Sequence, residues 1–487
     1  MLIHYLWFSW LLNMGVWDFQ KPVTELSASK NIQEDEVSVL KRVPWYSKAA
    51  SDQVNTWTNN VNFLAHYFQN STGNRYLIGG SNNSTAYNLE YRTTSTWTAL
   101  TGGSYALRAD AELSAVNYLD KLFIVWYDAT DSEYLLPATI TGTVHTTSTW
   151  TDTNLTDMPS GKYIVEYNDL IYVLNAYISS NKYPSSAYYC DTPVDWSITW
   201  DNTVNFLEFW QQDWDEITWA ANSWNRLVVF KSNSMWTWDE SNKKKIASIG
   251  CDSYKSIKQV NWILYWFNRD GLWRWDWALP QLISGKVQPF IDAIDQSALS
   301  SVVSTVNGLE YRTFIWTVTV RWITYTNCWI VFDARREKFY IRCTISNALS
   351  ATEYVESWKK RSYFGSNTWY AYKFSTYIDW VNSDDWNDID YFFMTNALDM
   401  WNPHIEKYLG KTTFYTLNWN WLKYVIDADK SWEFKEWVSG QINESNIYWN
   451  DLWASWHRFT FKFFNKDSGT PMEFEWFSLE SNEKEST

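Results

Sequence analysis

Tryptophan stands at many positions of this sequence where a tight polar turn calls for glycine. The 487-residue chain has 37 tryptophans and only 16 glycines, whereas glycine makes up about 7% of an average protein. Trp196, Trp322 and Trp380 each follow a charged residue in a turn-like context. Such turns often need a residue with φ > 0, which glycine adopts without steric cost and a bulky residue does not.

We therefore hypothesise that about two dozen tryptophan codons are read as glycine in the source organism, which would bring glycine to its usual share. The positions include Trp7, Trp10, Trp17, Trp45, Trp126, Trp196, Trp214, Trp219, Trp262, Trp277, Trp316, Trp322, Trp380, Trp386, Trp401, Trp419, Trp421 and Trp456. In contrast, Trp236, Trp238, Trp273 and Trp275 alternate as strand side chains do and are expected to be genuine tryptophans. The alternative is a truly tryptophan-rich protein, such as a binder of sugars or of membrane interfaces.

Composition narrows the classes of function. The formal net charge of −15 argues against a non-specific nucleic-acid binder, because that role needs a basic surface, and no sequence-specific nucleic-acid partner is expected. The four cysteines are far apart and are predicted to be reduced core residues. The histidines do not pair at metal-ligand spacing, so no metal site is expected. The apolar start of the chain lacks a basic segment and a cleavage site, so neither a signal peptide nor a membrane span is expected.

A weak repeat runs through residues 60–375. Each copy is a polar turn followed by a short apolar strand, and several copies continue into a second alternating strand. The seven copies are residues 73–78, 117–124, 167–173, 223–230, 260–267, 326–332 and 360–365. Their mean period of roughly 48 residues is within the range of propeller blades. The sequence therefore predicts an all-β fold with a β-propeller of about seven four-stranded blades; an irregular sandwich with coincidental spacing is the alternative.

The remaining chain is expected to form a lead-in and a second domain. We predict an N-terminal arm and lead-in at residues 1–58, the propeller at residues 59–378, and a small β-sandwich at residues 379–487, where alternating strands resume. Short helical turns are expected within residues 20–38 and around residues 291–299.

With glycine at the turn positions, three parts of the chain resemble propeller-bearing tail proteins of tailed bacteriophages, which include packaged-DNA stabilisation, tail-hub and nozzle proteins. The opening (residues 8–46), the central stretch (residues 213–272) and the segment at residues 389–407 carry the resemblance. Three departures are clear: Leu11 stands where the family often has glycine, Val43 is inserted before the proline, and the spacing of the blades varies.

The resemblance implies a non-enzymatic structural protein of the virion. Such proteins assemble in a homo-oligomeric ring, commonly six-fold, next to other tail and portal proteins. They act as a head–tail connector that extends the portal channel and retains or conducts DNA. The rival interpretations are a receptor- or glycan-binding propeller on a tail tip or cell surface, and a propeller hydrolase.

No catalytic, cofactor-binding or metal-binding residues are predicted. Residues 427–432 resemble half of a calcium loop, but position 12 is Val438 where glutamate is needed. The acids of residues 379–390 are expected to form a solvated loop. No nucleotide-binding or nucleophile motif is present. Trp236, Trp238, Trp273 and Trp275 are expected to pack between blades, although aromatic rings at this spacing could also stack sugars or bases.

Overall fold

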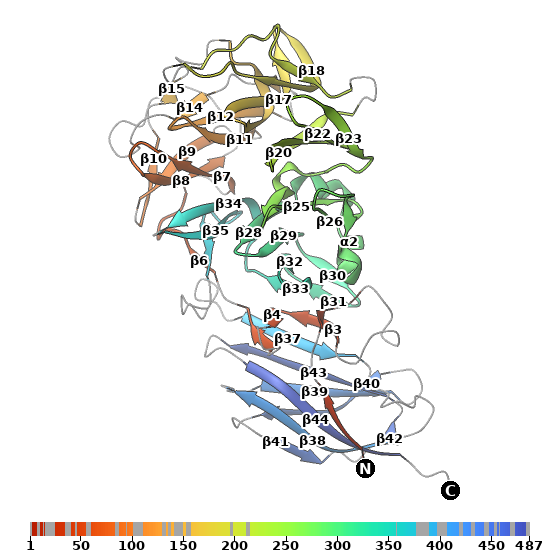
Figure 1. Ribbon diagram of the computed structural model, residues 1–487. Helices are drawn as coiled ribbons and strands as arrows, with labels where there is room; N and C mark the ends of the chain where they lie inside the picture. Colours follow the sequence, from red (N-terminus) through yellow and green to blue (C-terminus); the bar gives the residue numbers. More distant parts are fainter. Residues whose placement is uncertain are drawn as a thin grey trace.

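The structure is a computed structural model in which β-strands dominate (Figure 1). It describes residues 2–6, 10–12, 14, 25–34, 40–43, 46–54, 60–82, 87–93, 95–100, 111–128, 133–134, 138–140, 150–151, 157–194, 198–210, 215–356, 358–375, 389–396, 407–417, 422–429, 434–442, 448–451, 455–456, 458–467 and 473–483. The prediction of an all-β fold is confirmed, and the architecture is β-propeller-like.

Between residues 60 and 374 the described strands form seven successive antiparallel sheets, most of them four-stranded, apart from one inserted two-stranded hairpin; a strand from residues 46–48 joins the seventh sheet. The first three contain β7 (Asn60–Phe68), β8 (Arg75–Asn82), β9 (Tyr87–Arg92) and β10 (Trp97–Ala99); β11 (Ala111–Tyr118), β12 (Lys121–Asp128), β13 (Glu133–Tyr134), β14 (Ala138–Ile140) and β15 (Trp150–Thr151); and β16 (Ser160–Tyr167), β17 (Leu170–Ile178), β18 (Asn181–Tyr189) and β19 (Phe206–Glu208). The fourth and fifth contain β20 (Ile217–Ser223), β21 (Arg226–Lys231), β22 (Met235–Trp238) and β23 (Lys243–Ala247); and β24 (Lys258–Val260), β25 (Ile263–Asn268), β26 (Gly271–Trp275) and β27 (Gln281–Leu282). The sixth contains β28 (Val303–Asn307), β29 (Glu310–Phe314), β32 (Cys328–Asp333) and β33 (Lys338–Cys343), and the seventh contains β34 (Ala348–Glu356), β35 (Lys359–Ser366), β36 (Ala371–Phe374) and β6 (Tyr46–Lys48).

Six of the seven sequence repeats fall on the second strand of a sheet, namely β8, β12, β17, β21, β25 and β35. The copy at residues 326–332 falls instead on β32, the third strand of the sixth sheet. The hairpin of β30 (Val318–Val320) and β31 (Ile323–Tyr325) is inserted between the second and third strands there. The second strand of the sixth sheet, which corresponds to the other six repeats, is β29, and it follows the turn at Gly308.

The seventh sheet closes the ring with a strand from the other end of the chain. β6 pairs with β36, so Tyr46 lies opposite Phe374. The Tyr46 ring packs edge-on against Phe364, Tyr372 and Phe374 at centroid distances of 5.4, 5.1 and 6.5 Å. β34 lies beside β7, which places the seventh sheet next to the first (Figure 1).

A network of charged side chains joins the first and seventh sheets. Glu356 accepts hydrogen bonds from Arg92 of the first sheet (2.8 Å) and from Tyr363 and Lys373 of the seventh (both 3.1 Å). Burial disfavours the ionised carboxylate, but Arg92 and Lys373 outweigh burial and lower the pKa of Glu356 to about 2. The contact between the first and seventh sheets is therefore stabilised while Glu356 is charged.

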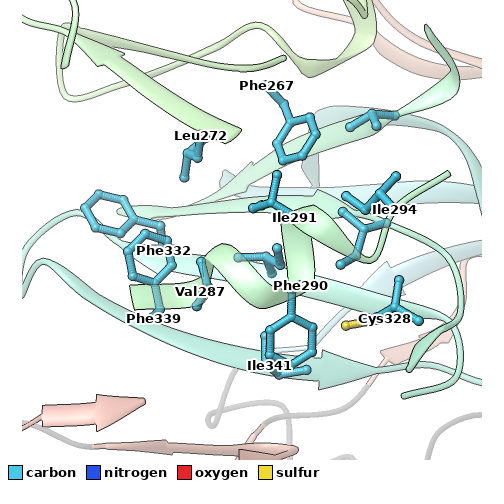
Figure 2. Close-up of a cluster of buried hydrophobic side chains, with 14 of the residues drawn as sticks. Phe267, Leu272, Val287, Phe290, Ile291, Ile294, Cys328, Phe332, Phe339 and Ile341 are labelled. Carbon is cyan, nitrogen blue, oxygen red and sulfur yellow. The ribbon is translucent and has the colours of Figure 1, made fainter. Parts of the chain in front are cut away.

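Apolar side chains fill the spaces between consecutive sheets. Figure 2 shows the cluster between the fifth and sixth sheets, where the short helix α2 (Gln288–Asp292) inserts Phe290 and Ile291 among strand residues such as Phe267 and Ile341. Trp275 is buried between the fourth and fifth sheets, and Trp273 packs against the same cluster. Trp236 and Trp238 pack between the third and fourth sheets. The expectation that these four tryptophans pack between sheets is confirmed.

Tyrosine hydroxyls connect the sheets by reaching into hairpin turns. Tyr67 and Tyr167 each donate a 2.8 Å hydrogen bond to a turn carbonyl of the next sheet, at Asp120 and Asn225. Tyr118 donates in the same way to Asp169. Tyr118 and Tyr167 end the first strand of their sheets, and Tyr67 is the residue before the end of β7. Each acceptor lies between the first and second strands of the following sheet. The same contact therefore repeats across the first four sheets.

In the second to fifth sheets, the hairpin turn between the first and second strands has two successive residues with left-handed backbone. The φ values of Asn168 and Asp169 are 50° and 59°, and those of Asn261 and Trp262 are 48° and 70°. Two residues with φ > 0 define the turn whose twist matches antiparallel strands, and Asn-Gly is its preferred sequence. Glycine at position 262 would give this pair.

Eight tryptophans of the described chain have positive φ: Trp210, Trp224, Trp262, Trp277, Trp316, Trp322, Trp358 and Trp369. Four of these are among the positions named from the sequence. A bulky residue held in this region costs of order 1–3 kcal/mol. Trp322 is 98% exposed and Trp358 90%, so their rings gain little burial in return. The left-handed backbone at these positions therefore favours glycine.

Other tryptophans at which the sequence favoured glycine do not have positive φ in the described chain. Trp126 and Trp219 lie in β12 and β20 without positive φ, and Trp126 is buried. Trp10 and Trp456 also lie in strands. At these four positions the backbone conformation does not require glycine. The remaining named positions, Trp7, Trp17, Trp45, Trp196, Trp214, Trp380, Trp386, Trp401, Trp419 and Trp421, lie outside the described residues.

The chain's two ends combine in two further sheets. One contains β1 (Leu2–Leu6), β4 (Ile32–Glu34), β5 (Leu40–Arg42), β38 (Lys407–Leu417), β41 (Tyr448–Asp451), β42 (Ser455–Trp456) and β44 (Glu473–Glu483). The other contains β2 (Trp10–Leu12), β3 (Glu25–Lys30), β37 (Ile389–Thr395), β39 (Leu422–Asp429), β40 (Phe434–Ile442) and β43 (Arg458–Asp467). Phe393 and Phe463 of the second sheet lie 5.0 and 5.2 Å from Phe474 of the first, so the two sheets share one core.

The helix predictions have a mixed outcome. The turns expected around residues 291–299 are confirmed by α2 and by the 3₁₀ helix η5 (Gln296–Ser301), with η3 (Tyr254–Ser256) and η4 (Ser284–Val287) as further short turns. The helical turn expected within residues 20–38 is wrong over residues 25–34. β3 and β4 lie there because they pair with β37 and β5.

The left-handed turns predict opposite effects for two classes of tryptophan. Replacing Trp262 or Trp322 with glycine should raise the free energy of unfolding by about 1 kcal/mol. Replacing the buried Trp266 or Trp329 with glycine should lower it by about 3–5 kcal/mol. Urea unfolding measures both, with Trp322→Ala as the control that removes the indole but keeps Cβ. Trp322→Gly variants no more stable than Trp322→Ala would contradict the role given to φ.

The Glu356 network predicts an acid-dependent loss of stability. The folded pKa of about 2 lies below the ordinary value of 4.5, so this contribution is fully present above pH 4.5 and is lost as the pH falls through 2. Glu356→Gln should lower the free energy of unfolding at pH 7 by about 2 kcal/mol, and the difference from wild type should shrink in acid. Unfolding curves at a series of pH values test this, and a difference independent of pH would refute it.

Candidate ligand site in the central cavity

The first strands of several sheets enclose a cavity of about 360 Å³. β7, β11, β20, β24 and β34 contribute to its wall, together with the short helix η3. These strands belong to the first, second, fourth, fifth and seventh sheets, so the cavity lies where the inner edges of the sheets meet. Its position follows from the ring arrangement rather than from any local motif.

Two lysines give the cavity a positive character. Lys255 and Lys258 line it from one side, and both are half-buried. Burial lowers the pKa of both ammonium groups, while Glu112 and Glu353 oppose this effect at Lys255 and Lys258 respectively. Within the described part of the chain, neither ammonium group has a hydrogen bond or an ion pair.

Acidic side chains are missing from the wall as far as the structure describes it. The described lining residues include no aspartate or glutamate. Glu353 itself pairs with Lys360. His66 also lines the cavity, and its pKa is lowered to about 4 by burial and by the charges of Arg75 and Lys360. The imidazole is therefore neutral at pH 7, and the nearby formal charges are mainly positive.

Aromatic rings form the wall next to the lysines. Trp219 and Tyr254 line the cavity and stack with a centroid distance of 5.3 Å and an interplanar angle of 30°. Tyr163 completes the group, 5.0 Å from Tyr254 and 5.5 Å from Trp219. Such a surface can pack against the C–H face of a ring-shaped ligand.

Polar side chains of the wall fall into two groups. Asn117 and Ser350 form hydrogen bonds between neighbouring sheets. Asn117 binds the backbone at His66 and Phe68, and Ser350 donates to the Val61 carbonyl at 2.8 Å. Asn62 and Thr352 have no hydrogen-bond partner in the described part of the chain. The latter two remain available to a ligand.

The sites weighed from the sequence are not brought together here. Asp427 and Asp429 lie in β39, paired with β40, and the turn that follows them is outside the described residues. Of the acids at residues 379–390, Asp390 alone is described, and it pairs with Lys30 at 2.7 Å. Within the described chain, no three His, Cys, Asp or Glu side chains are grouped to hold a metal ion.

The four cysteines are all buried and free, as predicted from their spacing. Burial raises the pKa of the Cys190 thiol to about 11 and of Cys251 to about 12. These two thiols are therefore protonated at neutral pH. No helix of the described chain is both long enough and apolar enough to cross a membrane.

Sequence reasoning missed the cavity residues. Lys255 and Lys258 lie in a short polar stretch that looks like an ordinary solvated turn. The one available signal was their place at the start of a repeat, since the first strand of a blade faces the centre of a ring.

Comparison with known proteins leaves the family open. No protein-family description matches the chain, and no curated protein matches it. Solved structures with a similar arrangement include an exo-β-1,3-galactanase from Phanerochaete chrysosporium (8% identity, TM-score 0.28, 87% of this chain and 100% of that chain), Trypanosoma rangeli sialidase (9%, 0.31, 93% and 94%) and the AfRom2 CNH domain (6%, 0.35, 68% and 99%). Likenesses this distant carry no argument about activity or ligand.

Proposed function

We propose that this protein is a non-enzymatic structural component of a bacteriophage virion. It forms part of the tail hub or nozzle, extends the portal channel, and retains or conducts DNA. Its fold in this proposal is a seven-bladed propeller followed by a small β-sandwich. Copies of the chain assemble in a ring, commonly six-fold, in contact with other tail and portal proteins.

The observation that carries the proposal is the order of the chain's parts. An N-terminal arm, a ring of sheets and a two-sheet C-terminal region follow one another as in the family that residues 8–46, 213–272 and 389–407 resemble. The arm is hydrogen-bonded into the C-terminal sheets through β3 and β37 and into the ring through β6 and β36. A body tied together in this way suits a part that transmits load between neighbouring subunits.

The net charge supports a role beside DNA rather than one in binding it. At −15 the chain repels a polyanion, and a wall that repels DNA lets it slide without sticking. The acidic character therefore fits a channel component.

A receptor- or glycan-binding propeller is the second candidate. The cavity with its lysines and stacked aromatic rings favours it, because such walls bind small polar ligands. A propeller hydrolase has less support: glycoside hydrolysis needs a pair of carboxylates, and none is found among the described lining residues.

The virion proposal predicts that the protein is present in purified phage particles at a fixed copy number per tail. Antibody labelling of the particles, followed by electron microscopy, should place it in a ring below the portal. Quantitative peptide counting against the portal protein should give a stoichiometry fixed by ring symmetry. Absence from purified particles, together with secretion from the producing cell, would refute the proposal in favour of the glycan-binding candidate.

A further inference from the structure

We propose that the central cavity binds a small sugar that carries an oxyanion, either a carboxylate or a phosphate. This inference rests on the cavity alone and holds whether or not the protein is part of a virion. The lysines would hold the oxyanion and the aromatic wall would hold the sugar ring.

The lysines provide the first part of the argument. A charged group taken out of water is costly unless it is paired. Lys255 lies in η3 and Lys258 begins β24. Both line the same cavity, and neither has an ion pair within the described chain. An oxyanion between them would supply the missing charge, and hydrogen bonds between ionised partners are about twice as strong as neutral ones.

The aromatic wall provides the second part. Tyr254 lies directly before Lys255, and its ring stacks with Trp219. A sugar whose acid group reaches the lysines would therefore have its ring beside this wall. Position 219 is one of those where the sequence favoured glycine, but the strand backbone there does not require it. The lysines and Tyr254 do not depend on that assignment.

The size and the remaining polar groups fit the same ligand class. A cavity of about 360 Å³ is at the lower end of the range for small-molecule sites, roughly 300–1,000 Å³. The side chains of Asn62 and Thr352 are available to sugar hydroxyls. Because the described wall has no carboxylate, the cavity would bind this sugar without cleaving it.

The test is calorimetric titration of the full chain with D-glucuronate, glucose 6-phosphate, glucose and inorganic phosphate. We expect glucuronate or glucose 6-phosphate to bind and glucose not to bind. Lys255→Met/Lys258→Met should weaken binding at least about tenfold, whereas the control Lys244→Met/Lys245→Met, which removes two exposed lysines of β23, should bind as wild type. Tighter binding of glucuronate identifies the carboxylate as the preferred group, and tighter binding of glucose 6-phosphate identifies the phosphate.

The thermal midpoint of the ligand-free protein tests whether the double variant has a folding defect. Because Lys255 and Lys258 have no ion pair in the described chain, their replacement by methionine should leave the thermal midpoint of the ligand-free protein unchanged or raise it. No binding of either acidic sugar, equal binding by the double variant, or inorganic phosphate binding as tightly as both sugars would overturn the proposal. A lowered midpoint of the ligand-free variant would also overturn it, since the lysines would then be structural.

Discussion

Four consecutive sheets of the ring, the second to the fifth, depend on a left-handed two-residue turn between their first and second strands. The turn sets the twist of the hairpin, because two residues with φ > 0 match the right-handed twist of antiparallel strands. It also presents the carbonyl that receives a tyrosine hydroxyl from the preceding sheet, as at Asp120, Asp169 and Asn225. One short segment thus controls both the geometry within a sheet and the contact between sheets.

The same constraint explains the unusual composition. In the fourth and fifth sheets the turn contains Trp224 and Trp262, and both rings are largely exposed. Together with Trp277, also at positive φ, they form a cluster with centroids 6.5 and 5.8 Å from Trp224. Exposed apolar clusters usually mark an interaction surface. Here every member of the cluster stands where the backbone favours glycine. The cluster exists only if these positions are tryptophan, so it is poor evidence for a partner.

The local part of the fold could be predicted from the sequence, and the long-range part could not. A polar turn before an alternating apolar run is a local signal, and it located a strand in each of the seven sheets. It placed residues 326–332 one strand too late because the hairpin of β30 and β31 interrupts the sixth sheet. The pairing of β6 with β36 joins residues more than 300 positions apart and leaves no local pattern. The cavity was missed for the same reason, since Lys255 and Lys258 acquire their environment only when distant strands meet around them.

Direct sequencing by mass spectrometry of the protein from its natural source tests the central claim most directly. Cleavage after Lys258 and Arg269 releases residues 259–269, which contain Trp262 in a left-handed turn and Trp266 in a buried strand. The account predicts glycine at position 262 and tryptophan at position 266 in the same peptide. Tryptophan at both positions would contradict it, and the bacteriophage resemblance would then lose the glycines on which it rests.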